Sequence, residues 1–205
     1  MKTPTFRVLA LAFALLAPAV AHAEGGPGAI DAFRSLDGVI SLSGDSDDRP
    51  DRDLQLRVDA MFDADWFAVQ ALGGTKHFAA RCGKRCDAFT ARMTRLVRAN
   101  YLQHVRARQG GTVRYVSETI GKENTVVHTK VTFPKSTTNT KQAARAVAVD
   151  YVMHKVAGKW RVREIKTNGV GLGQAYRAQL TKLYAAGGID AVFTKIDKTL
   201  TQLEG

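Results

Sequence analysis

The sequence predicts an α+β fold, in which N-terminal helices precede a four-stranded antiparallel meander sheet and further helices end the chain. Three observations lead to this prediction. Apolar residues recur every three or four positions near both ends of the chain, as on one face of a helix. In the middle, between residues 112 and 166, they alternate every second position, and glycine-containing turns separate the alternating segments. No internal repeat is present.

The first 23 residues have the organisation of a secretory signal peptide. Lys2 and Arg7 form the positive region, an apolar core spans 8–20, and Ala21-His22-Ala23 provides the small residues of a cleavage site. Cleavage after Ala23 would leave one exported domain over residues 24–205. The alternative is an uncleaved membrane anchor. No later segment approaches the ~20 apolar residues of a membrane span, so we expect a soluble mature protein.

The chain is basic, with 30 Lys and Arg against 19 Asp and Glu. Without Lys2 and Arg7 the formal charge is 28 − 19 = +9. Such a protein can meet anionic membranes, acidic proteins or nucleic acid. The charges are scattered and do not interleave with aromatic residues, so we expect no nucleic-acid partner and a solvated basic surface.

Helical spacing begins at residues 29–42, and a charged linker at 43–53 separates it from a second helix at 54–61. A third helix covers Trp66 to Leu72. Asp63 or Asp65 can cap its start, and Gly73-Gly74 ends it.

The two cysteines, Cys82 and Cys86, are expected to form a local disulfide at the junction between two helices. Gly83 permits the non-helical bend that lets the sulfurs meet. The spacing is not that of a redox or haem motif. A metal site with His77 is the alternative, although a closed zinc site needs four ligands.

The clearest helix follows at residues 89–105, with Asp87 as a candidate N-cap. Its apolar stripe opposes Arg92, Arg95 and Arg98, which we expect to face outward. Gly110-Gly111 then ends the helical periodicity.

Four strands are predicted at residues 112–120, 124–133, 144–155 and 160–166, joined by turns at 121–124, 134–142 and 157–159. One face of the sheet is apolar and suited to burial. The residues expected on that face are Val113, Tyr115, Ser117, Val127, Thr129, Val131, Phe133, Val147, Val149, Tyr151, Met153, Trp160, Val162 and Glu164.

A glycine-rich corner at residues 168–173 leads into the last helices, predicted at 174–186 and 189–203 with a break at Gly187-Gly188. Gly169, Gly171 and Gly173 superficially match a phosphate-binding loop. The parallel β-α-β context of such loops is missing, so close packing of the helix on the sheet explains these glycines better.

No catalytic constellation stands out in the sequence. The histidines lack metal-ligand spacing, and His128 and His154 have the parity of the outer strand face. Asp150 shares that outer parity. Glu164 is the one acid expected near the inner face, where it would form a salt bridge or, alternatively, serve as a catalytic carboxylate.

The chain resembles the MlaC family, the periplasmic phospholipid-binding components of the Mla pathway, also called the toluene-tolerance auxiliary family. The resemblance runs from about Ala29 to Leu203. It rests on the order of Phe62-Asp63, Leu72-Gly73, the helix with Phe89, Leu96 and Tyr101, Val149-Asp150-Tyr151, Gly158-Lys159-Trp160-Arg161-Val162, Gly169-Val170 with Leu172, Tyr176-Arg177 and Gly187-Gly188-Ile189-Asp190. The chain departs from the family pattern at Lys76-His77, at Arg163-Glu164, at Gly171 and in its cysteine pair.

The resemblance implies an internal apolar cavity for lipid tails, without cofactor, metal or catalysis. It also implies a monomer that carries phospholipid between an outer-membrane lipoprotein complex and an inner-membrane ABC transporter. The residues expected to contact the lipid are Phe89, Leu96, Tyr101, Tyr115, Val131, Val149, Tyr151, Met153, Trp160, Val162, Val170, Leu172 and Tyr176.

Three alternatives stay open at this point. The cargo could be another apolar lipid such as a hopanoid. The chain could be an exported cone-shaped α+β enzyme that uses Glu164. It could also have a purely structural or adhesive role, as a disulfide-clamped domain with a closed interior.

Overall fold

The computed structural model describes residues 28–43, 52–107, 112–133 and 145–204. The predicted signal peptide, and the part of the charged linker at 44–51, lie outside the described residues.

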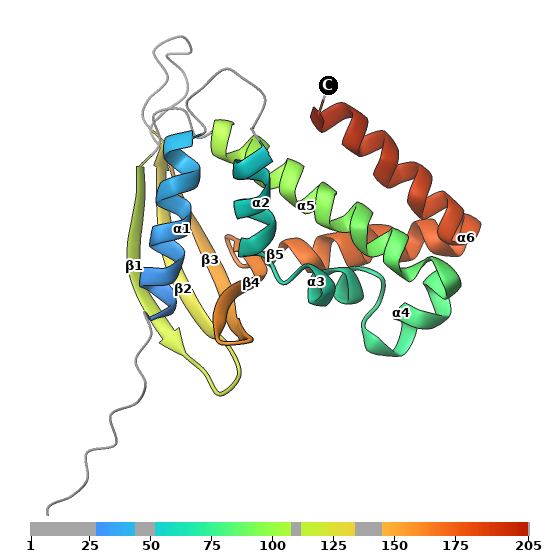
Figure 1. The fold of residues 1–205 in the computed structure, drawn as a ribbon, viewed down its shortest axis with the longest axis horizontal. Coiled ribbons are helices and arrows are strands. Elements are labelled where there is room, and N and C mark those ends of the chain that lie inside the picture. The colour runs from blue at the N-terminus through green and yellow to red at the C-terminus, as the bar shows by residue number, and fades with distance from the viewer. Residues whose placement is uncertain (1–27, 44–51, 108–111, 134–144, 205) are drawn as a thin grey trace, which may run out of the picture.

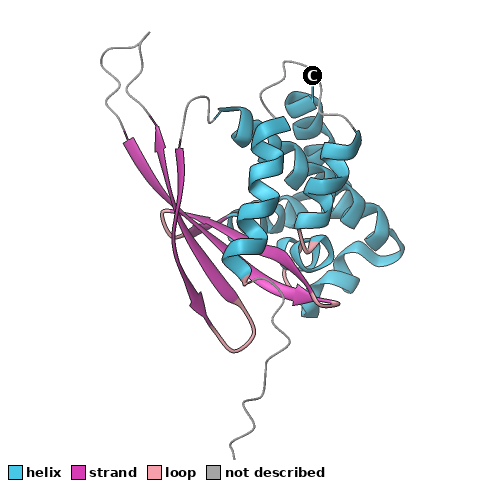
Figure 2. Cartoon of the chain, turned by 60° about the vertical axis from the view of Figure 1, so that its left-hand side comes forward, coloured by secondary structure: helices cyan, strands magenta, loops and turns pink. Residues whose placement is uncertain are grey.

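An antiparallel meander sheet forms one layer of the molecule (Figures 1 and 2). All four predicted strands are present with nearly the predicted bounds, but the predicted number of strands was wrong because a fifth is present. The strands lie in the order β1 (Thr112–Ile120), β2 (Thr125–Phe133), β3 (Arg145–Val156), β4 (Lys159–Thr167) and β5 (Val170–Gly171).

The fifth strand arises from a tight reversal after β4. Asn168 and Gly169 both have positive φ, 49° and 82°, which turns the chain back on itself. Val170 then pairs with Thr167, and Gly171 with Lys166. A strand of two residues is too short to show an alternating pattern, so the sequence predicts only a turn at this position.

A bulge in β1 corrects one predicted strand face. Tyr115 pairs with Thr129 and Ser117 with His128, so Val116 is an extra residue between them. The bulge places Ser117 on the outer face, beside His128, and turns Glu118 inward opposite Val127. The predicted inward position of Ser117 was therefore wrong.

A second bulge, in β4, changes the predicted face of Glu164. Met153 pairs with Val162 and Val152 pairs with Glu164, which leaves Arg163 as the extra residue. Glu164 therefore does not share a face with Val162, contrary to the predicted parity. The chain before α3 docks here, since the backbone N–H of Asp63 donates to the carbonyl of Val162 at 2.9 Å.

The helices cover one face of the sheet, which we call the inner face (Figure 2). The N-terminal helices are α1 (Ala29–Ser43), α2 (Arg52–Met61), α3 (Ala64–Ala71) and α4 (Thr75–Cys82), followed by a short 3-10 turn, η1 (Gly83–Arg85). Asp63 caps α3 as predicted, with its carboxylate accepting from Trp66 N at 3.4 Å. Glu118 on β1 accepts from Ile30 N at 3.0 Å and so ties the start of α1 to the sheet.

The remaining helices are α5 (Cys86–Ala107) and α6 (Leu172–Glu204). Helix α6 has non-helical geometry at Gly187 and Gly188, so it consists of two arms, as predicted, and the second arm returns beside α5 (Figure 1). Asp87 lies inside the first turn of α5, because that helix begins at Cys86. The proposed N-cap at Asp87 was therefore wrong.

The arginines of α5 were predicted to face outward. In the structure they also join α5 to neighbouring helices. Arg92 pairs with Asp197 at 2.9 Å, Arg95 pairs with Glu204, and Arg98 pairs with Asp59 of α2. Two of these partners lie on the second arm of α6, so the stripe of arginines holds that arm against α5. The two more exposed pairs, those of Arg92 and Arg95, contribute little individually, about 0–1 kcal/mol each.

Candidate functional site

An open, mainly apolar pocket lies between the inner face of the sheet, the end of α5 and the start of α6. Its volume is about 540 Å³. Strands β2, β3 and β4 supply its floor, β5 one edge, and the two helices its walls. The lining residues are Asn100, Tyr101, Val131, Phe133, Arg145, Val147, Val149, Tyr151, Ile165, Thr167, Asn168, Val170, Gly171, Leu172 and Ala175.

The sheet register explains why these side chains converge. Inward positions of adjacent antiparallel strands stand side by side, and here Val149 pairs with Thr167 and Tyr151 with Ile165. The pocket follows β3 from Arg145 to Tyr151, a distance of about 20 Å at ~3.4 Å per residue. One further inward row along, Met153 and Val162 are completely buried, so the pocket ends at Tyr151 and its neighbours.

The outer end of the pocket is exposed and polar. Arg145 is exposed at the start of β3, and Thr167, Asn168 and Val170 are exposed at the β4–β5 edge of the pocket, Val170 to 64 %. The Arg145 guanidinium lies 4.9 Å from the centre of the Phe133 ring, a cation–π distance. None of the described residues that line the pocket carries a carboxylate. The mouth therefore presents a positive charge above an apolar interior.

Asn100 and Tyr176 connect the pocket wall to the core. The Asn100 Nδ2 donates to the Tyr176 hydroxyl at 2.9 Å. Burial raises the pKa of Tyr176, an effect that the bond from Asn100 partly opposes. Tyr176 is thus a buried phenol of the core that accepts a hydrogen bond from Asn100 on the pocket wall.

The inner end of the pocket is closed by aromatic rings that a buried carboxylate holds in place. Asp37 of α1 is only 3 % exposed. Its Oδ1 accepts from the Tyr101 hydroxyl at 3.0 Å and its Oδ2 accepts from the Tyr115 hydroxyl at 2.9 Å. Phe33 of α1 packs on Tyr151 with ring centres 3.9 Å apart. We call Phe33, Tyr101, Tyr115, Tyr151 and Asp37 the tyrosine wall.

Six of the thirteen residues predicted to contact a ligand line this pocket, namely Tyr101, Val131, Val149, Tyr151, Val170 and Leu172. Tyr115 stands behind the pocket in the tyrosine wall. Trp160 is half-buried under Lys155 near the β3–β4 turn, with the ammonium 5.0 Å from its ring centre. The others lie in the packed core outside the pocket: Phe89, Leu96, Met153, Val162 and Tyr176.

Several pocket residues had not been singled out from sequence as ligand contacts. Phe133, Val147 and Ile165 carry an alternating-strand signal, although the β4 bulge changes the phase for Ile165. Asp37 gave no signal, because a single acid in an amphipathic helix usually faces solvent.

Glu164 caps the start of α6. Its Oε1 accepts from Gly173 N at 2.8 Å and from Ile165 N at 3.0 Å. A Cβ at Gly171 or at Gly173 would lie 2.9 Å from Glu164 Oε2. The corner glycines therefore make room for this carboxylate, which accepts backbone N–H groups at a helix start. We predicted a salt bridge for Glu164. Its carboxylate instead accepts from two backbone N–H groups.

Comparison with known proteins identifies the family. The family model described as MlaC protein matches residues 41–198 of this chain, which is more than half of it. The chain belongs to the MlaC family. A search of curated proteins gave no significant match.

A solved structure supports the fold of this MlaC-family chain. The phospholipid-binding protein from Ralstonia solanacearum, solved in complex with a phospholipid, has a TM-score of 0.65 to it. The alignment covers 87 % of this chain and 100 % of that one, at 18 % sequence identity. The layered arrangement of helices and sheet is thus shared.

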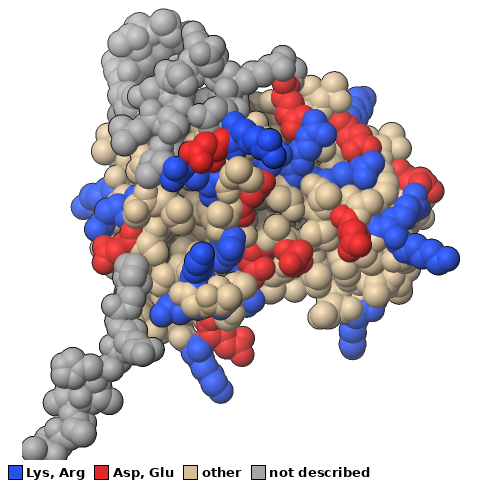
Figure 3. All heavy atoms as spheres, viewed as in Figure 1, with Lys and Arg blue, Asp and Glu red and all other residues tan. Residues whose placement is uncertain are grey.

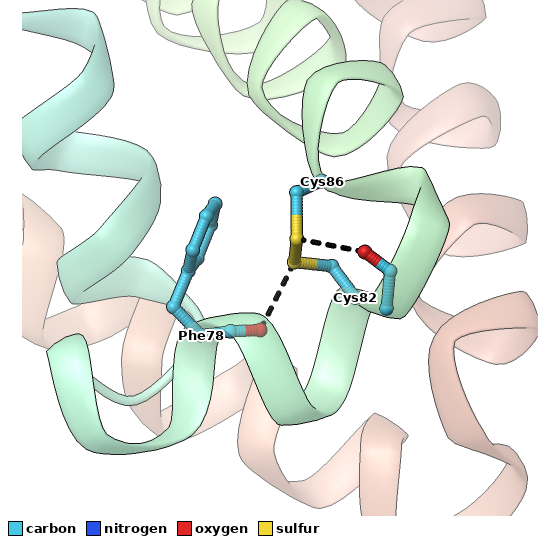
Figure 4. The surroundings of a disulfide bond; sticks show 4 residues. Phe78, Cys82 and Cys86 are labelled. Atoms are coloured by element: carbon cyan, nitrogen blue, oxygen red, sulfur yellow. Dashed lines mark hydrogen bonds between the residues drawn. A yellow bond between two sulfur atoms is a disulfide. The ribbon is translucent and has the colours of Figure 1, made fainter.

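The predicted disulfide of this MlaC-family chain is present between Cys82 at the end of α4 and Cys86 at the start of α5 (Figure 4). Gly83 between them has a φ of 56°, the non-helical bend that the sequence predicted. The dashed lines in Figure 4 join the sulfurs to the carbonyl oxygens of Phe78 and Gly83 at 3.0 and 3.2 Å. Disulfide sulfurs carry no proton, so we regard these as S···O contacts.

Other surfaces of the described part of the chain are less enclosed. A shallow hollow lies between the two arms of α6, beside Leu183 and Lys195. On the outer sheet face, His128 contacts Asp150 and Thr119, each at 2.9 Å. Within the described ranges there is no group of three metal-ligating side chains, and none of their helices is long and apolar enough to cross a membrane.

Proposed function

We propose that this chain is a periplasmic lipid carrier that holds the apolar part of a phospholipid in the pocket on the inner face of the sheet. The observation that carries the proposal is the combination of an apolar interior with a polar, positively charged mouth in a member of the MlaC family. The bound phospholipid of the Ralstonia protein, which has the same fold, supports the cargo class.

The physical requirement for such a carrier is clear. Each methylene exposed to water costs about 0.8 kcal/mol, so a chain of many methylenes does not leave a membrane unless something encloses it. A pocket that encloses the chain and leaves the head at its mouth meets this requirement. Arg145 would then face the phosphate of the head, where a positive charge stabilises an anion.

Transport between an outer-membrane complex and an inner-membrane ABC transporter is part of the same proposal. Export with cleavage after Ala23 would place the carrier between the two membranes. Its excess of basic residues would favour encounters with acidic partners or anionic membrane surfaces. The lipid is cargo rather than a cofactor, and the carrier acts as a monomer without catalysis.

The alternative of a cone-shaped enzyme has weaker support. The Glu164 carboxylate accepts hydrogen bonds from the N–H groups of Gly173 and Ile165, and Glu164 does not line the pocket. The row of Thr119, His128 and Asp150 crosses the outer face of the sheet, opposite the pocket. A catalytic dyad within the pocket would have to come from other residues.

The test is lipid analysis of the exported protein. We expect native mass spectrometry of protein purified from the periplasm to show bound lipid and an N-terminus at Glu24. A Val149→Trp variant should lose the lipid because the indole fills the pocket. Val116→Trp, on the exposed β1 bulge, is the matched control and should retain it. A chain that carries no lipid under any condition would contradict the proposal.

A further inference from the structure

We propose that one end of the sheet docks on an anionic membrane surface, at a place separate from the pocket mouth. We call this region the hairpin end. It consists of the β1–β2 turn with the last residue of β1 (120–124) and the β3–β4 turn with its flanks (155–160). The inference adds a contact surface to the molecule and does not depend on which cargo the pocket holds.

The two turns of the hairpin end lie side by side. Strand β2 pairs with both β1 and β3, so the β1–β2 and β3–β4 turns are at the same end of the sheet. His154 Nδ1 lies 2.6 Å from the carbonyl oxygen of Glu123 and joins the two turns. Helix α1 begins beside Glu118, and the β1–β2 hairpin extends past this helix (Figure 1).

Large apolar side chains are exposed at this end. Ile120 is 77 % exposed, more than any other large apolar side chain in the described part of the chain, and Val156 is 36 % exposed. A single exposed apolar residue is common, but here two lie on adjacent turns. Trp160 lies half-buried next to the β3–β4 turn. An indole is suited to the boundary between a membrane and water because its ring is apolar and its N–H is polar.

Lysines surround these apolar side chains. Lys122, Lys155 and Lys159 are all exposed, and Glu123 is the single acid within the hairpin end, so its formal charge is 3 − 1 = +2. The Lys155 ammonium lies 5.0 Å from the centre of the Trp160 ring. A lysine can lay its aliphatic stem along an apolar surface while its ammonium reaches a phosphate. Each lysine near an anionic bilayer adds to the attraction.

An anionic bilayer fits this surface better than a protein partner does. The apolar side chains lie at the tips of a protruding part of the molecule, where they can enter the headgroup layer while the lysines beside them contact phosphates. A protein partner would need a hollow that accepts both turns, with acids opposite the three lysines.

The hairpin end lies far from the mouth of the pocket. Arg145 at the mouth and Val156 at the turn are 156 − 145 = 11 residues apart on β3, about 37 Å at ~3.4 Å per residue. A molecule docked by its hairpin end therefore holds the mouth away from the bilayer. We infer that this contact keeps the protein at a membrane and that lipid exchange takes place elsewhere on its surface.

The experiment measures co-sedimentation of the purified protein with vesicles. One set is phosphatidylcholine alone, and the other contains equal parts of phosphatidylcholine and phosphatidylglycerol. We expect about tenfold stronger binding to the anionic vesicles. The difference should disappear in 1 M salt, where the Debye length is about 3 Å.

Variants test the two components of the hairpin end. Ile120→Ser should weaken binding to anionic vesicles about tenfold, because an apolar side chain no longer enters the interface. Lys122→Glu with Lys159→Glu should weaken it about tenfold or more through reversed charge. These side chains are exposed, so the variants should keep the fold, and circular dichroism checks this.

Matched controls lie on the helices. Leu56→Ser removes an apolar side chain of α2 that is 57 % exposed, and Lys182→Glu with Lys198→Glu makes the same change of charge on α6. Both should bind vesicles nearly as the unaltered protein does. A loss as large as that of the hairpin-end variants would show that overall charge or apolarity is the cause and would overturn the inference.

The pocket-filled Val149→Trp variant separates docking from cargo uptake. It should carry no lipid and still bind anionic vesicles as the unaltered protein does. Loss of vesicle binding in this variant would show that the pocket makes the contact, which contradicts docking by the hairpin end. A protein that carries lipid but binds neither kind of vesicle would refute the membrane contact and leave the carrier function in place.

Discussion

Gly171 has no side chain, and this leaves room for the Glu164 carboxylate to cap helix α6. The Glu164 carboxylate occupies the space that a Cβ at this position would take, and the same carboxylate caps the start of α6. The sequence departs from the family pattern both at Gly171 and at Arg163-Glu164. In the structure the Glu164 carboxylate lies where a Cβ at Gly171 would need room, so these two positions constrain each other.

The first prediction concerns this contact. Gly171→Ala should lower the free energy of unfolding by about 1–2 kcal/mol, because Glu164 must give up a capping bond to make room. Chemical denaturation measures the change. Gly38→Ala, in an exposed position of α1 with open space around it, should instead add about 0.5–1 kcal/mol.

A double variant sharpens the test. In a Glu164→Ala background, Gly171→Ala should cost much less, since the obstructing carboxylate is gone. Equal costs in both backgrounds would show that the contact with Glu164 is not the cause.

Tyr176 gives a prediction about alkaline pH. Burial raises the pKa of this phenol above its ordinary value of 10.0, so above pH 10 the unfolded chain releases the proton while the folded chain keeps it. Stability therefore falls as pH rises through this range. Tyr176→Phe should cost about 1 kcal/mol at pH 7, through loss of the bond from Asn100, and progressively less above pH 10.

Measurement of the free energy of unfolding for both proteins from pH 7 to 11 tests this sign. The gap between them should stay constant up to about pH 9 and then narrow. A gap that is still unchanged at pH 11 would contradict a raised pKa for Tyr176.

At the scale of elements, the disulfide fixes the angle between α4 and α5. It closes a loop of a few residues, for which the chain-entropy account gives about 2 kcal/mol. It also lies apart from the pocket, since neither cysteine is among the lining residues. Its effect should therefore be on stability and not on cargo.

The corresponding prediction is a lower melting temperature without a change in bound lipid. Cys82→Ala with Cys86→Ala should melt about 4–8 °C below the unaltered protein in calorimetry. Reductant should lower the melting temperature of the unaltered protein to a similar extent and leave the double variant as it was. A reductant-insensitive unaltered protein would indicate that the bond does not form in solution.

At the scale of the whole molecule, charge and cavity belong to different parts of the surface. Basic and acidic side chains are interspersed over the face seen in Figure 3, as the scattered charges of the sequence suggested. The pocket, by contrast, has an apolar interior with Arg145 at its mouth. General charge can thus steer encounters while the pocket determines the cargo.

The prediction at this scale is that cargo stabilises the fold. Lipid at a free concentration 100 times its dissociation constant should add about 2.7 kcal/mol. For a chain of this size that corresponds to about 5–10 °C in melting temperature. Calorimetry of delipidated and reloaded protein measures the shift. The pocket-filled Val149→Trp variant should show none, and an equal shift in that variant would place the lipid elsewhere.

The sequence by itself determined the class of fold, the order and approximate bounds of the main elements, and the disulfide. These features depend on local chemistry: a period of 3.6 or 2, a glycine at a turn, or two cysteines a few residues apart. The break at Gly187-Gly188 and the cap at Asp63 belong to the same kind of signal.

The tertiary structure alone decided which apolar residues line a cavity and which fill the core. Tyr151 and Met153 are both large side chains on the inner face of β3. The pocket nevertheless ends between them, because Tyr101 of α5 and Phe33 of α1 pack there. The bulges at Val116 and Arg163 likewise follow from pairing with neighbouring strands. Asp37 meets Tyr101 and Tyr115 across 64 and 78 residues, a distance over which sequence periodicity carries no information.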